Sequence, residues 1–150
     1  MTSRDDRSLS TPLTAYDRLD ILDLYARAAR AEDAGDAEEF VAAFTEEGVL
    51  EAPHGIFRGP DELRRYLVES ASVRKGRRHL TANHVVTVEG DGARALADFV
   101  ILEVDDAPRV LATGTYSDTI AREEGALRFS HRKVVPDPGM RKERRRMQGT

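Results

Sequence analysis

The chain has 150 residues, 40% of them hydrophobic and 33% charged, and this length and composition are typical of one water-soluble domain. No apolar run reaches the ~18 residues that a membrane-spanning helix needs, so no such helix is predicted. It contains no cysteine, so disulfides, thiolate metal ligands and a cysteine nucleophile are excluded. The net charge is −4, but the last ten residues carry five cations and one anion, so the remaining chain is at −8 and would repel nucleic acid.

The first twelve residues are expected to form a flexible tail. Residues 1–12 are polar, mix both charge signs and lack the apolar core of a secretory signal, which predicts a cytoplasmic protein with no membrane partner. Residues 13–34 then predict one long amphipathic helix, which Gly35 ends. Its apolar stripe would contain Leu19, Leu22, Ala26 and Ala29.

Two further helices flank a predicted hairpin. Asp36 and Glu39 have the spacing of a capping box, which predicts a short second helix. Its core-facing side chains would be Phe40, Val41 and Phe44. Residues 48–53 and 56–58 predict two short strands joined at a His-Gly turn. A third helix is expected over residues 59–72, because a proline suits its first turn.

The second half of the chain predicts an antiparallel sheet. Four segments of strand composition are separated by tight turns, which is the pattern of a β-meander. They are residues 78–89, 93–104, 110–122 and 127–136. We therefore expect one α+β domain at residues 13–136, with three helices packed on a curved, mainly antiparallel sheet and a pocket for a small organic molecule. Residues 137–150 form a basic segment that is predicted to be disordered.

One carboxylate falls within the predicted apolar stripe of the first helix. At 100° per residue Asp33 lies about 20° from Leu22, so it is predicted to point toward the core. It also lies in the last turn, where the helix dipole disfavours an anion. Asp33 should therefore have a compensating partner, unless the helix frays there and the carboxylate reaches water.

The best partner for Asp33 is His79, at the start of the first long strand. Because side chains alternate along a strand, His79 shares a face with Thr81 and Asn83. The opposite face would carry Leu80, Ala82, Val86 and Val88. The face of His79 is thus polar and uncharged, as expected for a cavity wall. The alternative is a buried histidine that is bonded to a backbone carbonyl.

Several short motifs, in this order, resemble the SnoaL-like branch of the nuclear transport factor 2-like fold. They are residues 33–36 (DAGD), 44–49 (FTEEGV), Gly59 with 61–63 (DEL), 78–79 (RH) with Asn83, 90–93 (GDGA), 114–118 (GTYSD) and 129–132 (FSHR). Relatives with this pattern include scytalone dehydratase, bile acid dehydratase and lindane dehydrochlorinase. The similarity covers about residues 13–136.

The resemblance implies a cone-shaped α+β barrel that holds a small-molecule ligand and often dimerises through its outer sheet face. It also implies an Asp–His dyad in the catalytic members, which Asp33 and His79 match. In such a dyad Asp33 would accept the Nδ1 proton and His79 would act as general base through Nε2. No cofactor is expected.

The substrate-binding candidates are Tyr25, Asn83, Tyr116 and Arg132. The resemblance matches Arg132 to an arginine that stabilises negative charge in some relatives. His131 and Arg132 are adjacent in a strand, so at most one of them faces the pocket. The tyrosines could donate a phenol hydrogen bond, and Asn83 shares the predicted face of His79.

The remaining histidines are weaker candidates, and no metal site is expected. His84 should lie on the face opposite His79 unless a bulge intervenes, which favours a structural or dimer-contact role. His54 occupies a turn. The four histidines have no ligand-like spacing, and the sequence contains no phosphate-binding glycine loop.

These features predict a cofactor-independent lyase or isomerase, dehydratase- or cyclase-like, acting on a small apolar oxygenated molecule. The alternative is a non-catalytic small-molecule-binding or assembly domain of the same fold. The alternative is motivated by Ala28, since several catalytic relatives carry tyrosine or lysine near that position of the first helix.

Overall fold

The computed structural model describes residues 13–140 and residue 149. Its elements are α1 (Ala15–Ala34), α2 (Ala37–Ala42), β1 (Phe44–Ala52), β2 (Gly55–Arg58), α3 (Gly59–Glu69), α4 (Ala71–Arg74), β3 (Arg77–Glu89), β4 (Gly92–Glu103), β5 (Arg109–Glu123) and β6 (Ala126–Pro136). The predicted tail at residues 1–12 lies outside the described residues, as do positions 141–148 and 150 of the predicted C-terminal tail.

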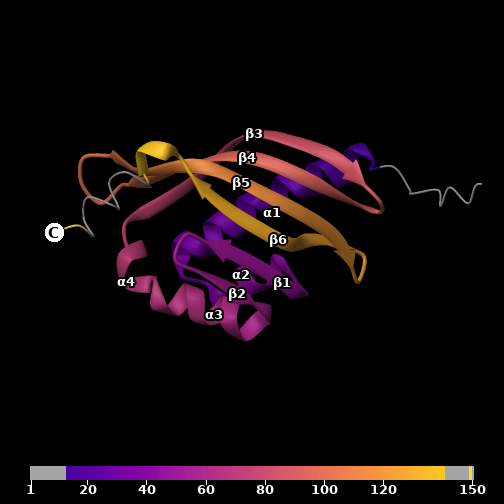
Figure 1. Cartoon of the computed structure of the whole chain (residues 1–150), viewed down its shortest axis with the longest axis horizontal. Helices are drawn as coiled ribbons and strands as arrows, with labels where there is room; N and C mark the ends of the chain where they lie inside the picture. Colours follow the sequence, from indigo (N-terminus) through magenta and orange to yellow (C-terminus); the bar gives the residue numbers. More distant parts are fainter. Residues whose placement is uncertain (1–12, 141–148, 150) are drawn as a thin grey trace, which may run out of the picture.

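All six strands form one sheet with the order β2-β1-β6-β5-β4-β3. The predicted meander is confirmed, because β3, β4, β5 and β6 pair antiparallel in sequence order. The pairing of β1 with β6 is parallel and was not predicted. It places Leu50 opposite Arg132, far apart in the sequence, and no local pattern signals such a contact. The mixed α+β fold with a curved sheet is confirmed (Figure 1).

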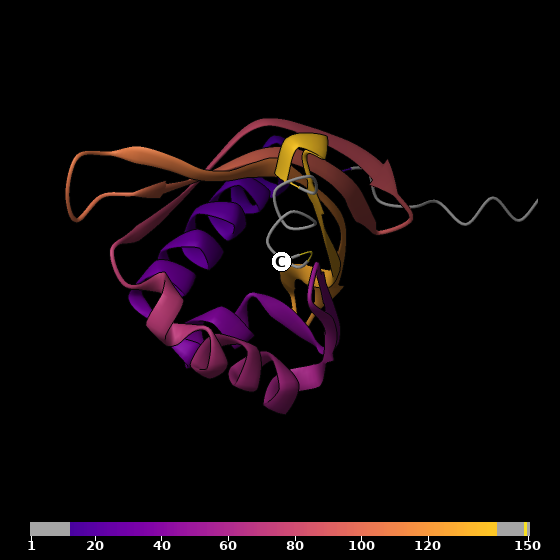
Figure 2. The same cartoon turned by 60° about the vertical axis from the view of Figure 1, so that its left-hand side comes forward.

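The helices lie on the concave side of the curved sheet. Figure 2 shows α1 directly beneath the sheet and α3 on the far side of the molecule from β3 and β4. The ends of α1 are well defined, since Thr14 and Asp17 form a capping box and Gly35 adopts the left-handed conformation at its C-terminus. None of the helices in the described residues is long and apolar enough to cross a membrane.

The predicted apolar stripe of α1 is wrong. Leu19 is 59% exposed and Leu22 is 42% exposed. The buried residues of the helix are Ile21, Leu24, Tyr25, Ala28, Ala31 and Glu32. This face lies roughly a third of a turn from the predicted one. The helix is rich in alanine, so two faces have similar hydrophobicity, and the large side chains Ile21, Leu24 and Tyr25 decide which is buried.

The predicted faces of β3 are also wrong beyond residue 82. The register of β3 with β4 shifts between Ala82 and Val85, and Asn83 has a positive φ of 53°. This bulge exchanges the two faces of the strand. Asn83 consequently donates to Asp98 on the outer face, at 2.7 Å. His84 instead turns inward, with its ring 4.8 Å from that of Tyr25.

Smaller differences concern element ends. Phe44, which was predicted in the second helix, begins β1 and remains buried. The predicted third helix divides into α3 and α4 at Ser70. The fold also continues past residue 136, because the backbone N–H of Asp137 donates to the carbonyl of Thr113 at 3.0 Å. Residues 138–140 are helical, so these first residues of the predicted tail belong to the folded part.

One glycine allows two aromatic rings to stack beneath the sheet. A Cβ at Gly114 would lie 2.7 Å from the ring of Phe99 and 2.4 Å from the carbonyl oxygen of Val135. The absence of that Cβ lets Phe99 pack beside β5, where its ring stacks on Tyr116 with centroids 4.7 Å apart. This stacked pair forms part of the interior described next.

Candidate active site

The interior holds a cavity of about 490 Å³ between the sheet and the helices. Its polar lining, within the described part of the chain, is formed by Glu32, His54, Tyr66, Arg77, His79, Tyr116 and Arg132. Phe40, Leu50, Phe99, Ile101, Val134 and Met140 supply much of the apolar lining. Its volume is within the range of roughly 300–1,000 Å³ that is usual for small-molecule sites.

Asp33 holds the imidazole of His79 from behind the cavity wall. His79 Nδ1 lies 2.5 Å from Asp33 Oδ1, and the carboxylate also accepts the backbone N–H of His79 at 3.0 and 3.1 Å. Because a carboxylate can only accept, Nδ1 carries a proton and Nε2 remains for the cavity. Asp33 itself lies on the flank of α1 beside β3, with its side chain 20% exposed, and is not in the cavity lining.

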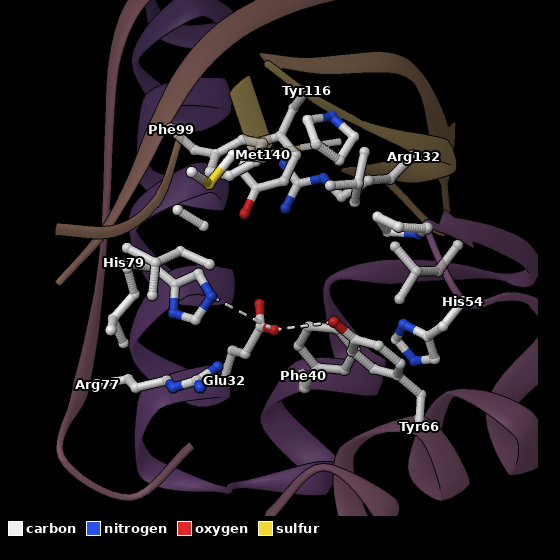
Figure 3. Close-up of a pocket in the computed structure, with 17 residues that line it drawn as sticks. Glu32, Phe40, His54, Tyr66, Arg77, His79, Phe99, Tyr116, Arg132 and Met140 are labelled. Atoms are coloured by element: carbon white, nitrogen blue, oxygen red, sulfur yellow. Dashed lines mark hydrogen bonds and ion pairs between the residues drawn. The ribbon is translucent and has the colours of Figure 1, made fainter. Parts of the chain in front are cut away.

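Glu32 is a second carboxylate at this site that was not predicted from the sequence. Its Oε1 lies 3.6 Å from His79 Nε2 and accepts a hydrogen bond of 3.0 Å from the hydroxyl of Tyr66 (Figure 3). The Glu32 side chain is only 10% exposed. A signal for it exists, because Ile21, Tyr25 and Glu32 follow the i, i+4, i+11 spacing of one helix face.

Arg132 enters the same cavity from β6 as part of a buried ion pair. Its Nε and Nη2 donate to the carboxylate of Asp118 at 3.1 and 2.9 Å, and Tyr25 donates to that carboxylate at 2.5 Å. The guanidinium carbon lies 4.0 Å from the ring centres of both Tyr116 and Phe129. Arg132 Nη1 has no hydrogen bond to any of the described residues, so it is a donor that a ligand could use.

Burial and charge fix the ionisation states around this pair. Burial, followed by the charge of Asp118, raises the pKa of Tyr25 far above its usual range. Burial, followed by the charge of Glu32, likewise raises the pKa of Tyr116. Burial disfavours the Arg132 cation, but the ion pair with Asp118 outweighs this, so the pKa of Arg132 is raised. Both phenols are therefore hydrogen-bond donors, and Arg132 is a permanent cation.

Comparison with known proteins identifies the domain. The model of the SnoaL-like domain family matches residues 14–133. This chain belongs to the SnoaL-like domain family. No functionally curated protein matches the chain.

Solved structures of similar proteins share this fold. A protein of unknown function with a cystatin-like fold from Nostoc punctiforme is 26% identical, with a TM-score of 0.80 over 85% of this chain and 96% of that one. A protein of unknown function from Mycobacterium tuberculosis is 30% identical, with a TM-score of 0.75 over 81% and 72%. A candidate scytalone dehydratase from Novosphingobium aromaticivorans is 19% identical, with a TM-score of 0.69 over 81% and 84%. This last likeness concerns the fold alone.

The SnoaL-like cavity has aromatic rings on two sides. Tyr66 stacks on Phe40 at a centroid distance of 5.8 Å and on His54 at 5.7 Å. Phe99 and Tyr116 form the other stacked pair. His54, from the turn between β1 and β2, therefore lies in the cavity wall, although its position in a turn gave it little weight. Flat apolar surfaces of this kind suit a ligand with rings.

Two predicted substrate-binding residues are not in the cavity lining. Asn83 lies on the outer face because of the bulge in β3, as described above. Tyr25 is buried, and its hydroxyl is used by Asp118 beneath Arg132. The predicted opposition of His131 and Arg132 is confirmed, since His131 Nε2 lies 3.4 Å from Glu51 on the outer face. Tyr116 and Arg132 both line the cavity.

Ala28 is fully buried and carries no polar group, which is the departure from the catalytic relatives seen in the sequence. Glu32 lies one helical turn further along the same face, and its carboxylate enters the cavity. The cavity of this SnoaL-like domain thus has a titratable group from this face of α1. Within residues 13–140, no group of three or more His, Asp or Glu side chains is placed to hold a metal ion.

Proposed function

We propose that this SnoaL-like domain is a cofactor-independent lyase or isomerase, dehydratase- or cyclase-like, with the Asp33–His79 dyad as its proton-transfer group. One observation carries the proposal: Nδ1 of His79 lies 2.5 Å from Asp33 Oδ1, while the imidazole ring itself lines a largely apolar cavity. Imidazole is the side chain best suited to exchange protons near neutral pH. A histidine with fixed orientation at a ligand cavity supports acid–base chemistry.

The rest of the cavity suits a carbonyl compound. Loss of a proton beside a carbonyl places negative charge on its oxygen. Arg132 Nη1 and the hydroxyl of Tyr116 are donors in the same cavity that could stabilise that charge. The apolar and aromatic lining favours a small molecule with rings and few polar atoms. The proposed substrate is therefore a largely apolar, oxygenated ring compound.

The proposal is tested with a panel of bicyclic β-hydroxy ketones and unsaturated ketones. Each reaction is monitored by the absorbance of its conjugated ketone. We expect the wild type to accelerate the conversion of some of them. The Asp33→Asn variant should be about tenfold to 100-fold slower, because its side chain no longer stabilises and orients the imidazolium. The limb of the pH–rate profile that reports His79 should also move to lower pH.

The control is Asp36→Asn, which changes an exposed carboxylate at the start of α2. This variant should keep the wild-type rate. Tight binding of panel compounds without any conversion, unchanged in Asp33→Asn, would contradict the proposal. That result would favour the alternative, a non-catalytic small-molecule-binding domain. The apolar side chain of Ala28 is the observation that motivates this alternative.

We also propose that the domain forms a homodimer through its outer sheet face. Leu80, Val85 and Leu96 are 48%, 59% and 48% exposed there, on the neighbouring strands β3 and β4. Exposed apolar side chains gathered on one sheet face favour association. Sedimentation should give a dimer for the wild type and a monomer for Leu96→Glu. The matched Val68→Glu variant on α3 should remain dimeric, and a monomeric wild type would contradict the proposal.

A further inference from the structure

His79 lies between two carboxylates, one on each side of its ring. Asp33 Oδ1 is 2.5 Å from Nδ1, and Glu32 Oε1 is 3.6 Å from Nε2. The two carboxylates come from consecutive residues of α1, which project in directions about 100° apart and so reach the two ring nitrogens. We propose that Glu32 is a second catalytic residue, acting as the base while His79 acts as the acid. This inference rests on the proposed function.

The charges around His79 favour this division of roles. Two carboxylates next to one imidazole stabilise its cationic form, and burial strengthens their effect. Among the described residues, the other charged or titratable side chains of the cavity are Arg77, Tyr66, Tyr116, His54 and Arg132. The cation of Arg132 is already paired with Asp118. A cationic His79 can give a proton but cannot take one, so the base should be the carboxylate beside it.

Tyr66 is the positioning residue for Glu32. Its hydroxyl donates to Glu32 Oε1 at 3.0 Å, and its ring is held by Phe40 and by Phe57, 5.0 Å away. The interactions from His79 through Glu32 to Tyr66 run across one side of the cavity (Figure 3). Helix α3 thus contributes to the orientation of a carboxylate on α1.

The two groups can carry out an elimination whose protons balance. Glu32 takes the proton from the carbon beside the carbonyl, and the electron pair of that C–H bond forms the enolate. The electron pair then forms the new double bond as the C–O bond to the hydroxyl breaks, and His79 Nε2 gives its proton to the departing oxygen. Water and an unsaturated ketone are the products. The proton on Glu32 then returns to His79 Nε2, 3.6 Å away, and the original state is restored.

The inference is tested by separating the base from the acid. A bicyclic ketone without a leaving group needs only the base, and its reaction is the uptake of deuterium from D2O. Dehydration of the matching β-hydroxy ketone needs both groups. Glu32→Gln should slow both reactions at least about 100-fold. His79→Gln should slow dehydration as much, yet keep deuterium uptake within about tenfold of the wild type.

The matched control is Glu39→Gln, an exposed position on α2 that should leave both rates unchanged. Tyr66→Phe should lower both rates less than Glu32→Gln does. Wild-type deuterium uptake in Glu32→Gln, with uptake lost in His79→Gln, would overturn the inference and leave the proposed function intact. Inactivity of the wild type would instead contradict the proposed function.

A second readout needs no substrate. NMR titration of the His79 ring should show that Glu32→Gln lowers its midpoint by about one pH unit or more, because a neighbouring negative charge is removed. The Glu39→Gln control should titrate as the wild type does. An unchanged His79 midpoint in Glu32→Gln would overturn the inference even if none of the probe compounds reacts.

Discussion

Replacing Asp118 with asparagine should lower the free energy of unfolding by about 3–5 kcal/mol, the cost expected when a buried ion pair loses one partner. The Asp118 side chain is fully buried, and that of Arg132 is 5% exposed. Asparagine would leave the guanidinium without a counter-charge beneath the sheet. It would also weaken the hydrogen bond that Tyr25 donates to this carboxylate. Urea unfolding measures the loss.

The control for this prediction is Asp98→Asn on the neighbouring strand. Asp98 accepts hydrogen bonds from Asn83 and Thr115, but it lies on the exposed outer face. Its replacement should change the free energy of unfolding by less than about 1 kcal/mol. Equal small losses in the two variants would show that Asp118 does not hold a charge in the core. Addition of Arg132→Met to Asp118→Asn should recover part of the stability.

Replacing His79 with glutamine should lower the rate of dehydration of a reactive β-hydroxy ketone by about 10²–10⁴-fold, the usual contribution of one acid–base group. Glutamine is close in size and keeps the backbone N–H that Asp33 accepts. The fold should therefore persist, as circular dichroism and urea unfolding would verify. The substitution removes the imidazole ring of His79. Among the described residues of the cavity lining, this is the only ring with a nitrogen held by a carboxylate, that of Asp33.

The matched control is His131→Gln on β6. His131 lies on the outer face, 3.4 Å from Glu51 and outside the cavity lining. Its replacement should leave the rate unchanged. Dehydration at the wild-type rate in His79→Gln would contradict acid–base chemistry by this histidine. A similar loss in both variants would point to a general effect on the fold and not to the dyad.

The fold was predictable where local signals are strong. Gly35 ends α1 in the left-handed conformation, and Asp36 caps α2 as its spacing indicates. Tight turns separate the four long strands, so the meander follows from the sequence. The parallel pairing of β1 with β6 was not predictable, because it joins segments about 80 residues apart through tertiary packing alone. The cone shape of the fold was expected only from the resemblance to the SnoaL-like family.

The site was predictable only in part. The close contact of Asp33 with His79 was expected, but Asp33 does not lie in the buried stripe of α1 as predicted, because the buried face of this helix is centred elsewhere. The same error hid Glu32, which lies on the buried face. Asn83 was misplaced because a bulge changes the alternation of β3, and periodicity alone does not reveal a bulge.

The most direct test of the account is an NMR titration of the four histidines in the wild type and in Asp33→Asn, with His79 assigned through His79→Gln. The geometry predicts that the Asp33 carboxylate stabilises the His79 cation, so its removal should lower the titration midpoint of His79 by more than about one pH unit. A His79 that titrates identically in both proteins would contradict the dyad as a coupled pair, and the domain would then be treated as a binding module.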